Sequence, residues 1–349
     1  MITFRWFGPR DPIPLAFIRQ IPAVRGIVSA LFEIPVGEPW SLDQISSLCD
    51  EVETHDLSLT VIESIPVHED IKLGRPTRDQ LIDNYCESIR NLGRARIPVL
   101  CYNFMPVFDW VRTDLARTLV DGSTALAYDD DALAKIDLSR GTADLPGWAT
   151  RYTASELGAL LDAYRSVGET ELWENLAYFL ERVVPVASEC GVRMALHPDD
   201  PPWSIFGLPR IITSGAALER VTSIVDDVAN GITFCAGSLA ADRNNDLLEI
   251  IRCLGNKGRI HFAHCRNIRR TGPRSFEETA HPSEFGDVDM RAVLSALRDA
   301  GFSGPIRSDH GRMIWDENGQ PGYGLNDRAL GAAYLYGLWE GLAGKPAAT

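Results

Sequence analysis

Four short apolar segments of this chain each contain a side chain that can bind a metal ion, and they recur about 30 to 45 residues apart, roughly the length of one strand–helix unit. They are residues 193–200 (RMALHPDD), 231–238 (GITFCAGS), 259–267 (RIHFAHCRN) and 305–311 (PIRSDHG). In a parallel barrel the carboxyl ends of all strands converge on one mouth, where active sites are built. The sequence therefore predicts a metal site at such a mouth, formed by His197, Cys235, His264 and Asp309.

The rest of the chain supplies the remaining strands and the helices of a barrel. Short apolar runs predict strands at residues 3–7, 26–31, 58–67 and 98–104. Helical spacing of apolar residues predicts helices at residues 41–54, 77–92, 170–190, 215–221, 246–254, 290–300 and 326–342. Near-continuous apolar strands that alternate with helices indicate a parallel sheet covered on both faces. Eight such units predict an α/β fold, a (β/α)8 TIM barrel, with residues 1–349 as a single domain. An open doubly wound sheet is the alternative, but no glycine-rich phosphate motif follows the first strand.

The periodic pattern breaks between residues 107 and 153, a stretch too long for an ordinary connection. Turn signals at residues 120–122 (VDG) and at Pro146-Gly147 divide it. We expect an inserted hairpin near residues 118–128 that extends one face of the barrel. A loop of this length is either functional or an elaboration without a role, and the sequence leaves both open.

The predicted ligand set consists of two imidazoles, one thiolate and one carboxylate. Zn²⁺, Fe²⁺, Co²⁺ and Mn²⁺ all fit such a set. Thiolate favours the softer ions, and an open position for substrate oxygens is compatible with Mn²⁺ or Fe²⁺. A structural zinc site is the alternative, but structural zinc usually takes closely spaced cysteine pairs, and these ligands are far apart.

Strand parity distinguishes the two histidines of the segment 259–267. Side chains alternate between faces, so His264 and Arg266 share one face and His261 lies on the other. The face of His264 and Arg266 should point into the mouth because these residues lie nearest the carboxyl end, and His261 is expected to be structural. Arg266 is a candidate bidentate clamp for a substrate carboxylate, and a salt bridge at the barrel rim is the alternative.

Three residues in the loops after the last two strands are candidate acid–base groups: His310, Tyr323 and His281. Each could equally be an ordinary surface residue. His310 directly follows Asp309, and adjacent residues of a strand point to opposite faces. Both therefore reach the mouth only if the strand ends at Asp309 and the chain turns there, which Gly311 permits.

Composition excludes several classes of partner. The formal net charge of −14 disfavours nucleic acid and anionic membranes, and local arginine or lysine groups must reverse the field in any site for an acidic substrate. Seven scattered cysteines without a CxxC pair fit a reducing cytosol. The amino terminus has no apolar segment of signal-peptide length, and no run approaches the roughly 18 apolar residues of a membrane span. We expect a cytoplasmic protein.

Long motifs extend over almost the whole chain: FRWFGPRDP, ESIPVHEDIKLG, VLCYNFMPVFDWVRT, LHPDDPP, IFGLPRI, FCAGS, HFAHCRN, FEETAHPSEFGDVDM and SDHG. They resemble the mannonate dehydratase family. The resemblance implies a metal-dependent barrel related to the xylose-isomerase-like sugar enzymes, with Mn²⁺ or Fe²⁺ as the metal. It also implies dehydration of D-mannonate to 2-keto-3-deoxy-D-gluconate in hexuronate (glucuronate) breakdown. The family's metal ligands fall on the four residues chosen above, and its acid–base residues fall on His310 and Tyr323.

This reaction needs several polar groups at the mouth. A base takes the C2 proton, an acid protonates the departing C3 hydroxyl, and a divalent ion stabilises the charge on the carboxylate. We expect His310 and Tyr323 to share the proton transfers, without assigning which is the base, and His281 is the reserve candidate. The expected substrate-binding residues are Arg266, Asn103, His68, Lys72 and Arg5.

Two other functions stay open. A metal-dependent sugar isomerase or epimerase would use the same barrel and metal, but its product has an unchanged formula. A sugar-acid binding protein would keep Arg266 and need no redox-sensitive metal. We also expect a homo-oligomer, a dimer or larger.

Overall fold

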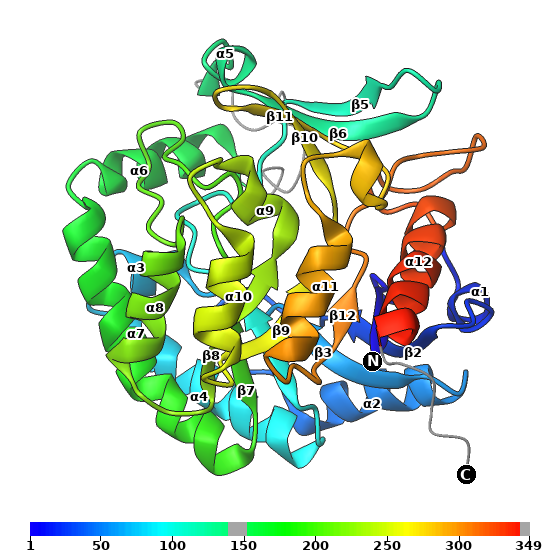
Figure 1. Ribbon diagram of the computed structural model, residues 1–349. Coiled ribbons are helices and arrows are strands. Elements are labelled where there is room, and N and C mark those ends of the chain that lie inside the picture. Colours follow the sequence, from blue (N-terminus) through cyan, green and yellow to red (C-terminus); the bar gives the residue numbers. More distant parts are fainter. Residues whose placement is uncertain (139–151, 343–349) are drawn as a thin grey trace.

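Eight parallel strands close into a barrel (Figure 1). The computed structural model describes residues 1–138 and 152–342 and orders the strands β1–β12–β9–β8–β7–β4–β3–β2 around the barrel. The (β/α)8 TIM barrel predicted from the sequence is thus confirmed, although the third strand ends at Glu63, earlier than expected. The strand bounds are β1 Ile2–Arg5, β2 Val24–Ser29, β3 Ser58–Glu63, β4 Val99–Tyr102, β7 Arg193–Leu196, β8 Asn230–Cys235, β9 Ile260–His264 and β12 Ile306–Arg307.

The barrel strands are buried on both faces, which explains their near-continuous apolar sequences. In β9, Phe262 belongs to the cluster that fills the barrel, so by parity His264 points inward as well. His261 points outward, and its Nδ1–H donates to the carbonyl of Met194 at 2.6 Å. The interior cluster consists of Val28, Val61, Val99, Cys101, Ala195 and Phe262.

Helices surround the barrel (Figure 1). Local sequence signals set their ends: Ser41 forms a capping box with Gln44 at the start of α2, and α7 ends at Gly191, which has a φ of 68°. Within residues 1–138 and 152–342, no helix is both long and apolar enough to cross a membrane. The bounds are α1 Leu15–Arg19, α2 Leu42–Glu53, α3 Glu69–Lys72, α4 Arg78–Arg94, α5 Asp130–Leu133, α6 Ala154–Tyr164, α7 Glu169–Cys190, α8 Gly215–Ile224, α9 Ala236–Ala241, α10 Leu247–Gly255, η3 Ser283–Phe285, α11 Met290–Asp299 and α12 Asn326–Leu342.

A second, four-stranded sheet lies over one end of the barrel, at the top of Figure 1. The hairpin expected near residues 118–128 is present as β5 (Asp114–Thr118) and β6 (Thr124–Asp129). A hairpin that the sequence did not predict, β10 (Ile268–Gly272) and β11 (Ser275–Glu278), pairs with it in the antiparallel order β10–β11–β6–β5. The expected turn at Pro146-Gly147 lies outside the described residues. This side sheet brings two distant insertions together beside the carboxyl ends of the barrel strands.

Candidate functional site

The four residues predicted as metal ligands meet at the mouth of the barrel. His197 directly follows β7, Cys235 ends β8 and His264 ends β9, and the potential ligand atoms of these three residues all lie within 4.8 Å of one another. Asp309 follows β12, and its Oδ2 lies 3.9 Å from Sγ of Cys235 and 3.7 Å from Nδ1 of His264. The barrel therefore brings together side chains that are far apart in the sequence.

The hydrogen bonds and charges of this cluster fit a bound cation. His197 Nδ1–H donates to the carbonyl of Pro198 at 2.6 Å, so its Nε2 is the nitrogen that faces Nδ1 of His264, at 3.2 Å. Burial would lower the pKa of His197, but the Cys235 sulfur and the nearby carboxylates raise it to about 9. Burial and Arg307 hold the pKa of His264 well below its ordinary value. The negative groups around His197 thus favour a positive charge at this position, and a divalent ion bound there would supply it.

A second group of potential ligands shares one member with the first. Glu63, Cys101 and His264 also place ligand atoms within 4.8 Å of one another. However, the carboxylate of Glu63 already forms ion pairs with Arg307 at 2.9 Å and Arg5 at 3.4 Å. Two guanidinium groups would repel a cation at that position, so the first group is the better metal site.

A turn at the end of β12 lets two adjacent residues face the mouth. Asp309 has a φ of 65°, in the left-handed region, directly after the two-residue strand and Ser308. Asp309 and His310 therefore both reach the site, as predicted. The prediction that Gly311 provides the turn is wrong, because Asp309 itself adopts the unusual conformation. Burial would raise the pKa of Asp309, but His310 and Arg307 hold it well below its ordinary value.

His310 stands between a carboxylate and a phenol. Its Nδ1 lies 2.9 Å and 3.0 Å from the two carboxylate oxygens of Glu278, and its Nε2 lies 2.9 Å from the hydroxyl of Tyr323. Burial would raise the pKa of Glu278, but His310, Arg266 and Arg112 lower it to about 2. Burial raises the pKa of Tyr323. At neutral pH the carboxylate is thus ionised and the phenol is neutral.

Sequence reasoning missed Glu278. It lies in the FEET run at the end of β11, a short strand with no apolar periodicity of the kind that identified the barrel strands. Nothing in the sequence connected Glu278 with His310, because the hairpin of β10 and β11 that carries Glu278 was not predicted.

An alternating chain of ion pairs runs around the mouth. Each carboxylate in it binds two guanidinium groups, and successive contacts measure between 2.5 and 3.4 Å. The last carboxylate, Glu278, lies 3.6 Å from its second partner, Arg266. Buried charges are tolerated when they are paired in this way. In order, the chain runs Arg5, Glu63, Arg307, Asp309, Arg266, Asp200, Arg112 and Glu278.

Arg266 lies inside this network and is not a free clamp. Its Nη2 lies 2.6 Å from Asp200 and 3.1 Å from the hydroxyl of Ser238, and its Nη1 lies 3.3 Å from Asp309. The residue is 2% exposed. Arg266 lines the same pocket as His310 and Tyr323, but both of its terminal nitrogens contact protein groups, a geometry that favours a buried ion pair over the expected grip on a substrate carboxylate.

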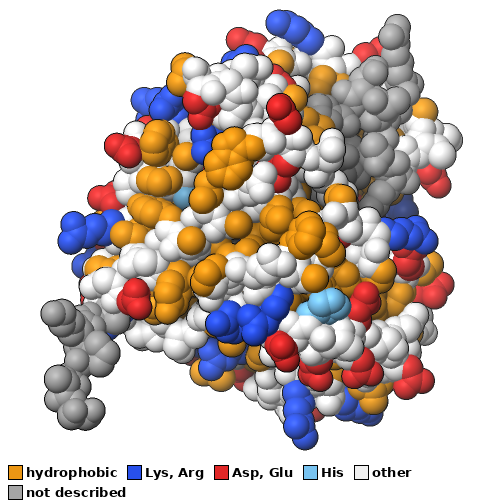
Figure 2. All heavy atoms as spheres, turned by 90° about the vertical axis from the view of Figure 1, so that its right-hand side faces the viewer, with side chains coloured by type: hydrophobic (Ala, Val, Ile, Leu, Met, Phe, Trp, Pro, Cys, Tyr) orange, Lys and Arg blue, Asp and Glu red, His pale blue; other side chains and the backbone are white. Residues whose placement is uncertain are grey.

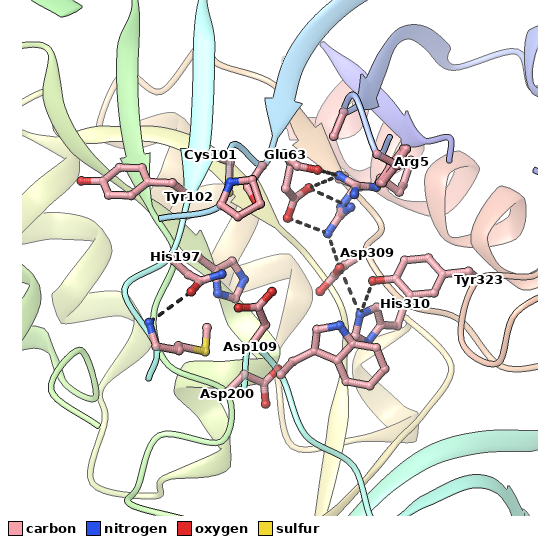
Figure 3. A pocket seen from close by; sticks show the side chains of 18 of the residues that line it. Arg5, Glu63, Cys101, Tyr102, Asp109, His197, Asp200, Asp309, His310 and Tyr323 are labelled. Carbon is pink, nitrogen blue, oxygen red and sulfur yellow. Dashed lines mark hydrogen bonds and ion pairs between the residues drawn. The ribbon is translucent and has the colours of Figure 1, made fainter. Parts of the chain in front are cut away.

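The other predicted site residues divide into two sets. Arg5 and Asn103 line the pocket beside the metal cluster together with His310 and Tyr323, and Figure 3 shows Arg5, His310 and Tyr323 around it. The same pocket is lined by Asp109, from the loop after β4, which sequence reasoning also missed.

Three predicted residues have other roles outside that pocket. Lys72 is buried, and its Nζ donates to Glu69 at 2.7 Å; His68 caps the short helix α3. The ring of His281 is 2% exposed, and its Nε2–H donates to the carbonyl of Ser308 at 2.8 Å. None of the three lines this pocket, but His68 and Lys72 line an adjoining pocket that shares Asn103 and Asp109 with it.

Comparisons with known proteins agree over nearly the whole chain. The family model for D-mannonate dehydratase (UxuA) matches residues 1–347. Mannonate dehydratase 2 of Halalkalibacterium halodurans is 55% identical over 342 residues, which cover 98% of this chain and 99% of that protein. The mannonate dehydratase of Streptococcus uberis is 55% identical over 339 residues, 97% of each chain.

Solved structures show the same relationship. The crystal structure of mannonate dehydratase from Streptococcus suis serotype 2 superposes with a TM-score of 0.92 at 50% identity, over 99% of this chain and 96% of that chain. A xylose isomerase domain protein from Planctomyces limnophilus shares the fold, with a TM-score of 0.56 at 13% identity over 99% of this chain and 97% of that chain.

Proposed function

We infer that this chain, which belongs to the D-mannonate dehydratase family, is a hydro-lyase that removes water from D-mannonate and forms 2-keto-3-deoxy-D-gluconate. The observation that carries this conclusion is the position of one acid–base pair, His310 and Tyr323, in a pocket that is also lined by two of the four potential metal ligands, His197 and Asp309. Elimination of water needs a proton acceptor, a proton donor and a means of stabilising charge on a carboxylate, and this pocket holds groups for all three.

The enzyme is metal-dependent, and we propose that His197, Cys235, His264 and Asp309 hold the ion. The donor set of imidazole, sulfur and carboxylate suits Mn²⁺ or Fe²⁺, the two ions that we propose as cofactor. When bound, a divalent ion acts as a Lewis acid that stabilises negative charge on the substrate carboxylate.

His310 and Tyr323 transfer the protons in this proposal. The imidazole Nε2 and the phenol oxygen are 2.9 Å apart, so a proton can pass between them without a solvent molecule. One of them takes the C2 proton of D-mannonate, and the other protonates the C3 hydroxyl as it leaves as water. The first proton can then return to the donor across the same hydrogen bond, which resets the pair after the turnover.

Arg5 and Asn103 are the proposed substrate-binding residues. Arg5 is held by Glu63 through Nη1, and its guanidinium lies over the rings of Phe7 and Phe32, at 4.9 Å and 5.5 Å from their centroids. This packing fixes a positive charge at the pocket wall, where it attracts a sugar acid. Asn103 accepts a hydrogen bond from the amide of Met105 through Oδ1, which leaves its amide nitrogen to donate to a substrate hydroxyl.

Location and assembly follow as further parts of this proposal. The seven unpaired cysteines fit a reducing cytoplasm. Figure 2 shows hydrophobic side chains gathered on the face that carries α12 and α1, and these helices expose Phe17, Leu330 and Tyr336. Apolar patches of this kind are common at subunit contacts, so this face is where we place the homo-oligomer contact.

The proposed function is tested by product analysis. The enzyme is incubated with D-mannonate and Mn²⁺, and in parallel with Fe²⁺ under anaerobic conditions, and the product is followed by mass spectrometry. We expect a product lighter by one water, and chelation of the metal should abolish its formation. A product with an unchanged formula would instead identify an isomerase or epimerase, and absence of turnover with either ion would contradict the proposal.

A further inference from the structure

Glu278, a residue of the side sheet, contacts His310 as closely as Tyr323 does, at 2.9 Å. Both carboxylate oxygens face Nδ1, at 2.9 Å and 3.0 Å, and the carboxyl side chain is 3% exposed. Arg266 also approaches Nδ1, at 3.2 Å. An ionised carboxylate can only accept and a guanidinium can only donate, so these two neighbours favour opposite tautomers of the imidazole.

We propose that Glu278 is the positioning residue that fixes the tautomer and the orientation of His310 for proton transfer. The inference rests on the proposed dehydratase function. Two carboxylate oxygens at shorter distances outweigh one guanidinium donor, so the proton of the neutral ring lies on Nδ1. The lone pair then lies on Nε2, which faces the hydroxyl of Tyr323 in the pocket. His310 is thereby the member of the pair that can accept a proton, and Tyr323 is the member that can donate one.

The two tautomers differ in what they offer the reaction. With the proton on Nδ1, Nε2 of His310 accepts the C2 proton, and the phenol of Tyr323 gives its proton to the departing C3 hydroxyl. The imidazolium then returns a proton to the phenolate, and no proton is gained or lost by the pair. With the proton on Nε2, the ring has no lone pair toward the pocket, and the same sequence cannot begin.

The position of Glu278 depends on the side sheet. It ends β11, which pairs with β6 through Phe276 and Tyr128. Its carboxylate is also held from the opposite side by Arg112, whose Nη2 and Nε donate to Oε1 at 2.7 Å and 3.1 Å. Arg112 precedes β5 and is fully buried. On this proposal both insertions serve the active site, because one carries Glu278 and the other carries Arg112.

The contacts of residue 278 with Arg112 and His310 explain why this position needs a carboxylate and not another hydrogen-bond acceptor. Glu278 pairs with Arg112 through Oε1 and accepts from His310 through both carboxylate oxygens. An amide in its place keeps the shape but presents either an acceptor or a donor to Nδ1. Arg266 would then compete as the donor to Nδ1 and shift the proton to Nε2.

The experiment compares Glu278→Gln with Glu277→Gln, a change of the neighbouring glutamate, which pairs with the half-exposed Arg269 at 3.7 Å. Turnover of D-mannonate, KM and Mn²⁺ affinity by titration are measured for both. We expect Glu278→Gln to lower kcat about 10²-fold or more, the scale of a mispositioned acid–base group. Its Mn²⁺ affinity should stay within about threefold of wild type, as should its KM. Glu277→Gln should match the wild type in all three.

A double variant separates a positioning role from general structural damage. If Glu278 acts through His310, then Glu278→Gln should cause no further loss of kcat in a His310→Asn background, whereas damage to the fold would add to it. Glu278→Asp, in the same two backgrounds, provides the test if the glutamine variant does not fold. An equal loss in both backgrounds, or a kcat within threefold of wild type for the single variant, overturns the proposal. Absence of product from the wild type in the same assay would instead contradict the proposed function.

Discussion

Replacement of Arg266 by lysine tests whether this residue holds the protein together or binds the substrate. The guanidinium joins Asp200 at 2.6 Å and Asp309 at 3.3 Å, and its side chain is 3% exposed. A lysine ammonium is a single point and can serve only one of these carboxylates well. Breaking a buried pair costs about 3–5 kcal/mol, and because the charge is kept we expect Arg266→Lys to lower the free energy of unfolding by about 3 kcal/mol.

Urea unfolding of the metal-free protein at neutral pH measures this cost, and Arg182→Lys is the matched control. Arg182 pairs with Asp83 at 2.9 Å, but both side chains are more than a third exposed, so the control should lose less than about 1 kcal/mol. Arg266→Lys should also weaken Mn²⁺ binding, because Asp309 loses a partner that orients it. A variant with wild-type stability and metal affinity but a strongly raised KM for D-mannonate would refute this reasoning and restore the carboxylate clamp.

Three further predictions concern single side chains. Cys235→Ser should lower Mn²⁺ affinity about tenfold or more in a titration, whereas Cys265→Ser, at a buried cysteine outside the proposed ligand set, should not. His310→Asn and Tyr323→Phe should each retain metal and lose about 10²-fold in kcat. When the reaction is run in D₂O, only the variant that lacks the acid should still exchange the C2 hydrogen of the substrate for deuterium. Burial lowers the pKa of His261 to about 4 from 6.5, so its contribution to stability is complete above pH 6.5 and falls as the pH drops toward 4. Between pH 7.5 and pH 5.0, the free energy of unfolding measured in urea should fall by about 2 kcal/mol more in the wild type than in His261→Asn. An equal fall in both proteins would contradict the lowered pKa of His261.

The barrel and the meeting of the four potential metal ligands at its mouth could be predicted because both follow from rules that act along short segments. An apolar strand buried on both faces has a recognisable composition, and a polar side chain at its carboxyl end has few destinations other than the mouth. Parity then separates His264 from His261, since Phe262 and His264 share the inner face of β9. Neither step requires knowledge of how distant parts of the chain pack.

The contacts that sequence reasoning did not predict depend on such packing. Lys72 looks like a mouth residue because it follows a strand, but the short helix α3 turns it toward Glu69. Glu278 and Arg112 lie in insertions that the pairing of β11 with β6 brings together, and of the two only Glu278 contacts His310. The hydrogen bond between Arg112 and Glu278 joins residues that are 166 positions apart, and it leaves no local signal in either segment.

The charges at the mouth explain how a protein with a net charge of −14 can bind an acidic sugar. The ion-pair chain contains four arginines and four carboxylates, so it contributes no net charge. A divalent ion held beside the thiolate of Cys235 would then leave one positive charge, which matches the single carboxylate of an aldonate. Besides the direct attraction proposed for Arg5, the arginines thus serve the substrate indirectly. By pairing with every carboxylate of this ion-pair network, including the proposed ligand Asp309, they prevent these carboxylates from cancelling the charge of the metal.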